Sequence, residues 1–293
     1  MKVKKAVIPV AGFGTRMLPA SKAIPKEMLP VVDRPAIQYV VEEAARAGIT
    51  EIMLVTHPAK QAIEAHFSAQ PELEAALAAK GKQKVLAEVQ GTLPTGVSLA
   101  SVLQLQPLGL GHAVACAADW VGDEPFAVLL PDVLLDDTAG THDLSAMTTA
   151  FDATGHAQIM VEAVAPARVD QYGIVALTRD IAAGQGAPIA AIVEKPSVDE
   201  APSNLAVVGR YVFPASILPL LKQTQAGKGG EIQLTDAIDA LLDKGQVDAW
   251  QMTGSSFDCG SKLGYLDAIL HFGLKHAEVG SGLQGLIDAR RQH

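Results

Sequence analysis

Short runs of Val, Ile and Leu alternate along this chain with longer segments in which apolar residues recur every three or four positions. The short runs are typical of strands buried in a sheet, and the longer segments are typical of amphipathic helices. Strands are predicted near residues 5–10, 51–56, 97–104, 126–131, 157–165, 172–177, 189–194, 205–213 and 247–252. Helices are predicted near residues 35–47, 59–69, 71–80, 111–121, 143–153, 214–223, 232–244, 261–276 and 283–291.

This alternation predicts an α/β fold, with a mixed, mainly parallel β-sheet flanked by helices. The helix at 35–47 has a start and a stop signal, because Pro35 suits an early helical position and Gly48 follows its last turn. No repeat, low-complexity tract or linker interrupts the chain. We therefore expect one α/β domain over residues 1–262 and a helical C-terminal extension over residues 263–293. The extension is a candidate subunit contact.

Composition narrows the class of protein. The 293 residues are 49% hydrophobic but only 4% aromatic, so the core is built mostly from aliphatic side chains. A formal net charge of -9 argues against nucleic acid as a partner, because nucleic acid binding relies on a basic face. No apolar stretch is long enough for a membrane helix, and none resembles a secretory signal. Cys116 and Cys259 have neither metal-type nor redox-type spacing, which predicts free thiols in a cytoplasmic protein.

Positive charge is concentrated beside a glycine-rich turn near the N-terminus. The first apolar run gives way to Ala11, Gly12 and Gly14, where the backbone can turn tightly and approach a ligand. Three cations follow in this segment: Arg16, Lys22 and Lys26. Such a combination favours phosphate binding over an ordinary tight turn.

Two other glycine-rich motifs fit this segment poorly. A dinucleotide-binding fingerprint has a third glycine that allows close packing of helix on strand, but Met17 stands at that position. The P-loop pattern also fails, because no Gly-Lys-Ser/Thr occurs. The phosphate site therefore belongs to neither class.

Two aspartates are candidate metal ligands. Asp132 follows the apolar strand at 126–131, at the carboxyl edge where open α/β sheets bind ligands. Asp258 stands in a similar place, after one strand and before a helix. Together they could hold Mg²⁺, which takes one or two protein carboxylates and keeps several waters. Alternatively, Asp132 caps a turn, and the nearby Asp136 or Asp137 is the ligand.

Two further segments could contact a sugar phosphate and a base. Glu194 and Lys195 end a strand, where the carboxylate could accept hydroxyl hydrogen bonds and the ammonium could meet a phosphate. A weak surface ion pair is the alternative. Gln104 can donate and accept hydrogen bonds, as base recognition requires, and Gly109 permits close backbone approach. Gly109 could instead simply shape a turn, and His112 is expected to be structural.

Taken in order, these segments resemble the bacterial sugar-1-phosphate nucleotidylyltransferases, and among them most closely the enzymes that use UTP and glucose 1-phosphate. The matching segments are Ala-Gly-Phe-Gly-Thr-Arg-Met-Leu-Pro (11–19), Lys-Ala-Ile-Pro-Lys-Glu-Met-Leu-Pro (22–30), Gly-Leu-Gly-His-Ala-Val (109–114), Leu-Leu-Pro-Asp (129–132), Val-Glu-Lys-Pro (193–196), Ser-Asn-Leu-Ala-Val-Val-Gly-Arg-Tyr-Val (203–212), Gly-Glu-Ile-Gln-Leu-Thr-Asp-Ala (230–237) and Asp-Cys-Gly-Ser-Lys-Leu-Gly-Tyr (258–265). They span nearly the whole chain, and the last two are the most specific.

The resemblance implies a Rossmann-like nucleotidyltransferase fold and a set of site residues. It implies nucleotide binding by Ala11, Gly12, Gly14, Thr15, Gln104 and Gly109; phosphate contacts and catalysis by Arg16, Lys26 and Lys195; sugar-phosphate binding by Gly173, Glu194 and Lys195; and a Mg²⁺ cofactor on Asp132 and Asp258. The implied reaction is transfer of UMP from UTP to α-D-glucose 1-phosphate, giving UDP-glucose and pyrophosphate. We further expect a homo-oligomer, a dimer or a tetramer.

Two departures from the family pattern bear on this reading. Leu103 and Leu105 flank the glutamine where many relatives have a basic residue and a glycine, and Val133 stands where some have a second acid. Alternatives are a thymidylyltransferase and a catalytically weak regulatory homologue, with a dehydrogenase a distant third. Weakly active homologues have lost a Thr-Arg pair that this chain keeps as Thr15 and Arg16, so we expect activity.

Overall fold

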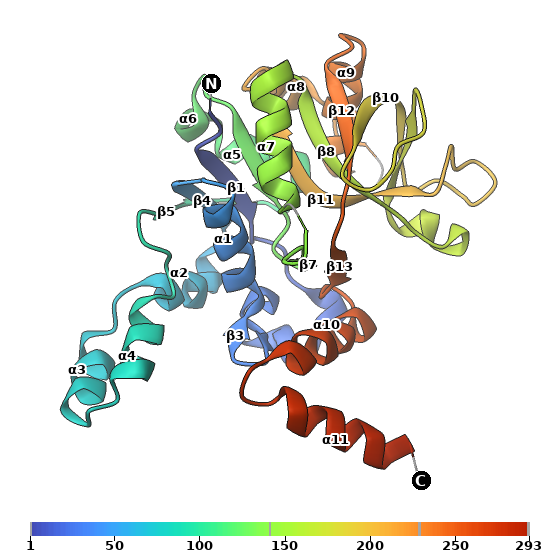
Figure 1. The fold of residues 1–293 in the computed structure, drawn as a ribbon. Coiled ribbons are helices and arrows are strands. Elements are labelled where there is room, and N and C mark those ends of the chain that lie inside the picture. Colours follow the sequence, from blue (N-terminus) through green and yellow to red (C-terminus); the bar gives the residue numbers. More distant parts are fainter. Residues whose placement is uncertain (1, 141, 228–229, 292–293) are drawn as a thin grey trace.

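A nine-stranded sheet forms the centre of the computed structural model, which describes residues 2–140, 142–227 and 230–291 (Figure 1). The strand order is β5-β4-β1-β6-β11-β8-β12-β10-β9. Their bounds are β1 Lys5–Pro9, β4 Glu51–Thr56, β5 Ser98–Leu103, β6 Phe126–Leu129, β8 Ala157–Ala163, β9 Gly173–Leu177, β10 Gly186–Glu194, β11 Leu205–Phe213 and β12 Val247–Gln251. Each predicted strand is present, with ends that shift by a few residues.

The sheet is mixed, as the sequence predicts. Strand β1 runs parallel to β4 and β6, and β4 runs parallel to β5. Strand β11 reverses this direction and pairs antiparallel with both β6 and β8. Because β1, β4 and β6 run the same way, their carboxyl ends meet at one edge, where α/β sheets place their ligands.

Helices cover both faces of the sheet and bury its central strands, whereas the edge strand β5 is largely exposed. On one face lie α1 (Ala36–Arg46) and α7 (Asp143–Thr154), and on the other lie α5 (Leu110–Cys116), α8 (Ile217–Gln223) and α9 (Leu234–Leu242) (Figure 1). Alternate residues of β1 point to opposite faces, so Ala6 and Ile8 join one apolar core and Val7 joins the other. This arrangement explains why the central strands read as continuous apolar runs.

A short two-stranded ribbon beside the sheet was absent from the sequence prediction. Strands β7 (Val133–Asp136) and β13 (Ser255–Asp258) pair antiparallel, with Val133 opposite Asp258. Four residues are too few to show a period of two, so the pattern gave no signal for either strand.

The predicted helices are also present, with two differences. Residues 111–121 form two short helices, α5 and α6 (Ala118–Val121), and residues 59–69 form a 3₁₀ turn followed by α2 (Gln61–Phe67). A helix that the sequence did not predict, α4 (Gln83–Gln90), pairs with α3 (Pro71–Ala79) in a projecting hairpin (Figure 1). Neither helix of this hairpin has a buried residue, and the eight residues of α4 are too few to establish a helical period in the sequence.

The C-terminal helices pack against the segment that follows the glycine-rich turn. Ser261 is the N-cap of helix α10 (Lys262–Lys275), and its hydroxyl accepts a hydrogen bond from Gly264 N at 3.1 Å. Tyr265 Oη donates to the carbonyl of Pro30 at 2.6 Å, in the small hairpin of β2 (Pro30–Val31) and β3 (Arg34–Pro35). Helix α11 (Gly280–Arg291) follows. The division between residues 262 and 263 stays a prediction. Among the helices of the described ranges, none combines the length and apolarity needed to span a membrane.

The buried carboxylate of Asp143 fixes the turn between β12 and β13. Asp143 is 0% exposed at the start of α7. Its oxygens accept hydrogen bonds from Thr253 N at 2.9 and 3.0 Å, Gly254 N at 3.2 Å and Trp250 Nε1 at 3.1 Å. One side chain therefore satisfies several buried donors, and the ribbon strand β13 starts directly after them.

Replacing this carboxylate should destabilise the fold markedly. In Asp143→Ala the buried donors lose their acceptor, and we expect the free energy of unfolding to fall by about 3 kcal/mol. Urea denaturation measures the change. The control is Asp152→Ala on the exposed face of the same helix, with an expected change within about 0.5 kcal/mol. Equal effects of the two substitutions would contradict this assignment.

Candidate active site

Two of the predicted cations, Lys22 and Lys26, lie close to each other beside the glycine-rich turn that follows β1. Gly14 adopts the left-handed conformation, with a φ of 63°. A Cβ at Gly14 would lie 3.1 Å from Cβ of Lys26, so the absence of a side chain lets Lys26 pack against the turn. Ala11, Thr15 and Lys26 line a hollow of about 290 Å³, together with Lys22 and Lys60. The structure thus brings most of the predicted phosphate-binding residues together. Gly12 is exposed, and a Cβ there would meet no atom within 4 Å.

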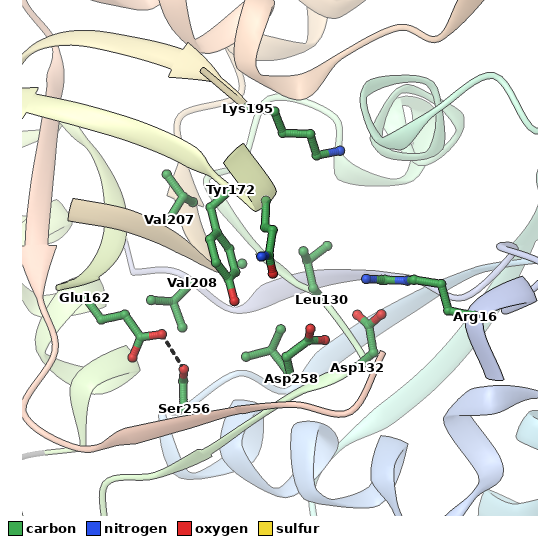
Figure 2. A pocket seen from close by; sticks show the side chains of 13 residues that line it. Arg16, Leu130, Asp132, Glu162, Tyr172, Lys195, Val207, Val208, Ser256 and Asp258 are labelled. Atoms are coloured by element: carbon green, nitrogen blue, oxygen red, sulfur yellow. Dashed lines mark hydrogen bonds between the residues drawn. The ribbon is translucent and has the colours of Figure 1, made fainter. Parts of the chain in front are cut away.

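A neighbouring cavity of about 360 Å³, the main cavity, is lined by charged residues from five segments, one of these residues being Glu162 on β8 (Figure 2). Arg16 enters from the glycine-rich turn, Asp132 from the end of β6, Lys195 from the end of β10 and Asp258 from the end of β13. Figure 2 shows Arg16, Asp132 and Asp258 pointing toward one another, with Lys195 above them. Segments that are distant in sequence therefore meet in one site, as the resemblance implies.

The two aspartates converge beside Gly260. The ribbon register places Asp258 opposite Val133, and Cys259 N donates to the carbonyl of Asp132 at 2.7 Å. A Cβ at Gly260 would lie 2.8 Å from Asp132 Oδ2 and from Arg16 Nη2, and 2.9 Å from Asp258 Oδ1. All three groups thus surround one small space that only glycine leaves open.

The buried charges here are held by their neighbours. Asp132 accepts a hydrogen bond from Lys26 Nζ. Burial acts to raise the pKa of Asp132, but the ammonium of Lys26 outweighs it, so the pKa is lowered overall. Burial acts to lower the pKa of Lys26, but the carboxylates of Asp132 and Glu27 outweigh it, so that pKa is raised overall. Both groups therefore remain charged near neutral pH.

The donor set suits a hard divalent cation. Asp132 and Asp258 offer carboxylate oxygens across the space beside Gly260, and Mg²⁺ prefers oxygen ligands while keeping several waters. In the part of the chain that the structure describes, no group of three or more potential metal ligands occurs. Asp136 and Asp137, the alternatives from the sequence, are engaged elsewhere: Asp136 with His271 and Lys275, and Asp137 with the Asp143 amide at 2.8 Å.

A buried ion pair beside the phosphate hollow was not predicted. Lys60 Nζ lies 3.1 and 2.9 Å from the carboxylate oxygens of Glu27. Burial raises the pKa of Glu27 and lowers the pKa of Lys60, and each partner opposes the shift of the other. Because Glu27 directly follows Lys26, the pair fixes the 3₁₀ turn that presents Lys26. The sequence signal was a lone acid in a cationic segment.

A second hollow, of about 200 Å³, adjoins the main cavity and contains the predicted sugar-binding residues. Gly173 lies opposite Glu194 in the pairing of β9 with β10. Thr235 Oγ1 donates to Glu194 Oε2 at 2.8 Å. Lys195 has a φ of 45°, a left-handed conformation unusual for lysine, and it lines both the main cavity and the smaller hollow.

Gln104 and Gly109 also come together, outside the lining of these hollows. Gln104 is 6% exposed, and its Nε2 donates to the Gly109 carbonyl at 3.2 Å and lies 2.9 Å from His112 Nδ1. Gly109 has a φ of 97°, and a Cβ there would lie 2.9 Å from the carbonyl oxygen of Ile232. His112 thus contacts the candidate base-reading side chain, which is compatible with the structural role expected from the sequence.

Several cavity residues carried no role in the sequence analysis. They are Glu162, Gln171, Tyr172, Gln233, Thr235 and Ser256. Gln233 and Thr235 stand in the matching segment 230–237, so their presence in a family motif was a signal that could have found them. Ser256 and Glu162 are joined by a hydrogen bond of 2.6 Å across β13 and β8, and no local pattern marks this contact.

Comparison with known proteins gives matches over nearly the whole chain. The family model described as nucleotidyl transferase matches residues 5–273. The UTP–glucose-1-phosphate uridylyltransferase of Escherichia coli strain K12 is 54% identical over 291 residues, covering 98% of this chain and 96% of that protein.

Solved structures agree with this result. A UDP-glucose pyrophosphorylase and a UTP-bound UGPase, both from Acinetobacter baumannii, are each 55% identical, with a TM-score of 0.91 over 97% of this chain and 98% of theirs. The resemblance inferred from the motifs and the predicted nucleotidyltransferase fold are both confirmed. The chain belongs to the nucleotidyl transferase family and groups there with the UTP–glucose-1-phosphate uridylyltransferases.

Proposed function

We propose that this chain transfers UMP from UTP to α-D-glucose 1-phosphate, with Mg²⁺ as cofactor, giving UDP-glucose and pyrophosphate. One observation carries the proposal: Arg16, Lys195, Asp132 and Asp258 line a single cavity in a chain that is 54% identical to a uridylyltransferase of this specificity. The UTP-bound relative from Acinetobacter baumannii supports the nucleotide half of the assignment.

The reaction exchanges one bond at phosphorus for another. An oxygen of the sugar phosphate forms a bond to the α-phosphorus of UTP, and the bond from that phosphorus to the bridging oxygen breaks. The bonding electron pair leaves with pyrophosphate. The attacking oxygen is already anionic near neutral pH, so no general base is needed. The barrier comes from repulsion between two polyanions and from alignment, which a charged and preorganised site can lower.

The cations of the site would align and neutralise the two substrates. Lys195 lines the main cavity and the smaller hollow and would hold the sugar phosphate for attack. Gly173 and Glu194 line the smaller hollow and would contact the sugar hydroxyls. Arg16 and Lys26 would hold the triphosphate and stabilise the charge that develops on the leaving pyrophosphate.

The nucleoside would bind along the glycine-rich turn. The backbone of Ala11, Gly12 and Gly14 and the hydroxyl of Thr15 would hold the ribose and phosphates. Gln104 and Gly109 would read the base. Because Gln104 Nε2 already donates to the Gly109 carbonyl, its side-chain oxygen is left to accept a hydrogen bond from the uracil imide.

Asp132 and Asp258 would hold Mg²⁺ in the space beside Gly260. When bound, the cation would neutralise phosphate charge and polarise the phosphoryl group. Lys26 keeps Asp132 ionised through their hydrogen bond, so this carboxylate is ready to bind a cation at neutral pH.

The subunit arrangement is also a proposal. Leu263, Leu266 and Leu270 are exposed on α10, and Leu286 is exposed on α11. The spacing of three and four residues places the leucines of α10 on one face of the helix, and an exposed apolar face is typical of an interaction surface. We propose that residues 263–293 form the contact of a homo-oligomer, a dimer or a tetramer, in the cytoplasm.

Turnover of different substrates tests the proposed function directly. Pyrophosphate release should be fastest with UTP and glucose 1-phosphate among a panel of nucleoside triphosphates and sugar 1-phosphates, and it should stop when a chelator removes the metal. Faster turnover with dTTP would favour a thymidylyltransferase. Nucleotide binding without any pyrophosphate release would favour a regulatory homologue.

Removal of either phosphate-binding cation should slow turnover, and urea denaturation shows how far Lys26→Ala, which leaves the Asp132 carboxylate without its ion-pair partner, is also destabilised. Arg16→Ala and Lys26→Ala should each lower kcat by about a hundredfold, the typical cost of losing one group that stabilises transition-state charge. Steady-state pyrophosphate assays measure this effect. Lys4→Ala, which removes an exposed cation just before β1, is the control and should leave kcat unchanged. Near-normal turnover in both site variants would refute these roles.

A further inference from the structure

Arg210 lies fully buried in the middle of the sheet, on β11, and it lines neither the main cavity nor the smaller hollow. The exposed fraction of this charged side chain is 0%, and its strand neighbours Tyr211 and Val212 are apolar core residues. It belongs to the matching segment 203–212, which the proposed function leaves unexplained. A buried guanidinium is costly unless every hydrogen-bond donor finds a partner.

All five N–H donors of Arg210 are engaged. Nε and Nη2 donate to the two carboxylate oxygens of Glu43 on α1, at 2.8 and 2.7 Å. Nη1 donates to the carbonyls of Leu130 at 3.0 Å and Gly209 at 3.3 Å. Nη2 also donates to the carbonyl of Val133 at 2.7 Å. Only the planar fork of arginine provides this many fixed donors.

Two of these carbonyls stand on either side of Asp132. Leu130 precedes it by two residues and Val133 directly follows it, so the guanidinium binds the backbone both before and after Asp132. From the other side, Cys259 N donates to the carbonyl of Asp132 itself, at 2.7 Å. The backbone that carries the proposed metal ligand is therefore held at three carbonyl groups, those of Leu130, Asp132 and Val133.

Stability alone gives a weak reason for such an ion pair. Buried pairs can often be exchanged for apolar side chains of similar size with little loss of stability, because burial costs offset the attraction of the charges. An apolar pair could fill the same space between α1 and β11. It could not hold the two carbonyls that flank Asp132. The geometry thus favours a positional role.

We propose that Arg210, with Glu43 as its counter-ion, is the residue that positions Asp132 for cation binding. This inference rests on the proposed function, in which Asp132 holds the divalent cation. Arg210 itself lines neither the main cavity nor the smaller hollow. It therefore acts through the 130–133 segment and touches no substrate. Loss of its fork should loosen the carboxylate without removing any substrate contact.

The test compares two variants with a matched control. Arg210→Lys keeps the charge but loses the fork. The double variant Glu43→Gln/Arg210→Met removes both charges, so that neither is left buried alone. The control is Lys5→Met, since Lys5 is also buried and bonds two carbonyls, Trp120 O at 3.1 Å and Val121 O at 3.2 Å, beside Glu124. Lys5 lies at the opposite end of β1 from the site.

The main readout is binding of Mn²⁺ alone, titrated by electron paramagnetic resonance in the absence of nucleotide. Arg210→Lys should weaken Mn²⁺ binding by about tenfold or more, the usual range for outer groups that orient a metal ligand. The Lys5→Met variant should bind Mn²⁺ like the parent protein. In turnover assays, Arg210→Lys should lower kcat while KM for glucose 1-phosphate changes less than about twofold, because no sugar contact is lost.

Parental Mn²⁺ affinity in folded Arg210→Lys would overturn the proposal. Urea denaturation shows whether each variant is folded, and if Arg210→Lys is unfolded, the double variant decides by the same titration. An equal loss of Mn²⁺ binding in Lys5→Met would also overturn it, because the effect would then be one of general destabilisation. If the parent protein binds Mn²⁺ but releases no pyrophosphate from any substrate pair, the proposed function fails while the titration still decides the role of Arg210.

Discussion

The site depends on one short pairing, the ribbon of β7 and β13. Its register sets Asp258 opposite Val133, and the hydrogen bond from Cys259 N to the Asp132 carbonyl closes its end. Without this pairing the two aspartates would lie on unrelated segments. With it, they face each other across Gly260, and Arg16 reaches the same space from the glycine-rich turn. The remaining contacts hold this arrangement in place.

Each buried charge around that space has an opposite partner. Lys26 pairs with Asp132, Lys60 with Glu27, and Arg210 with Glu43. Such pairs add little net stability, because removing two charges from water costs about as much as their attraction returns. Their value lies in geometry. Catalysis by alignment and charge neutralisation requires groups that are already in place before the substrates arrive, and neighbouring groups that do not contact the substrates provide that order.

Much of the fold and part of the site could be predicted from the sequence, for clear physical reasons. Strands buried on both faces, such as β1, give continuous apolar runs, and the turn at Gly14 and the cations after it are local features. Long-range pairing has no such signal. The four-residue strands β7 and β13 are too short for a period, and Arg210 meets Glu43 and the 130–133 segment only in the folded chain. Motif order supplied what periodicity could not, since it linked Asp132 to Asp258.

Arg16, Asp132 and Asp258 are expected to act together around the space beside Gly260. The measurement is pyrophosphate release by Gly260→Ala, because the new methyl group would displace the charged ends of these three side chains rather than the backbone. The control is Gly285→Ala on α11, where a Cβ meets nothing within 4 Å. We expect Gly260→Ala to keep the urea resistance of the parent protein but to lose about a hundredfold in kcat. Gly285→Ala should keep both the urea resistance and the kcat of the parent protein. Parental turnover in Gly260→Ala would contradict it.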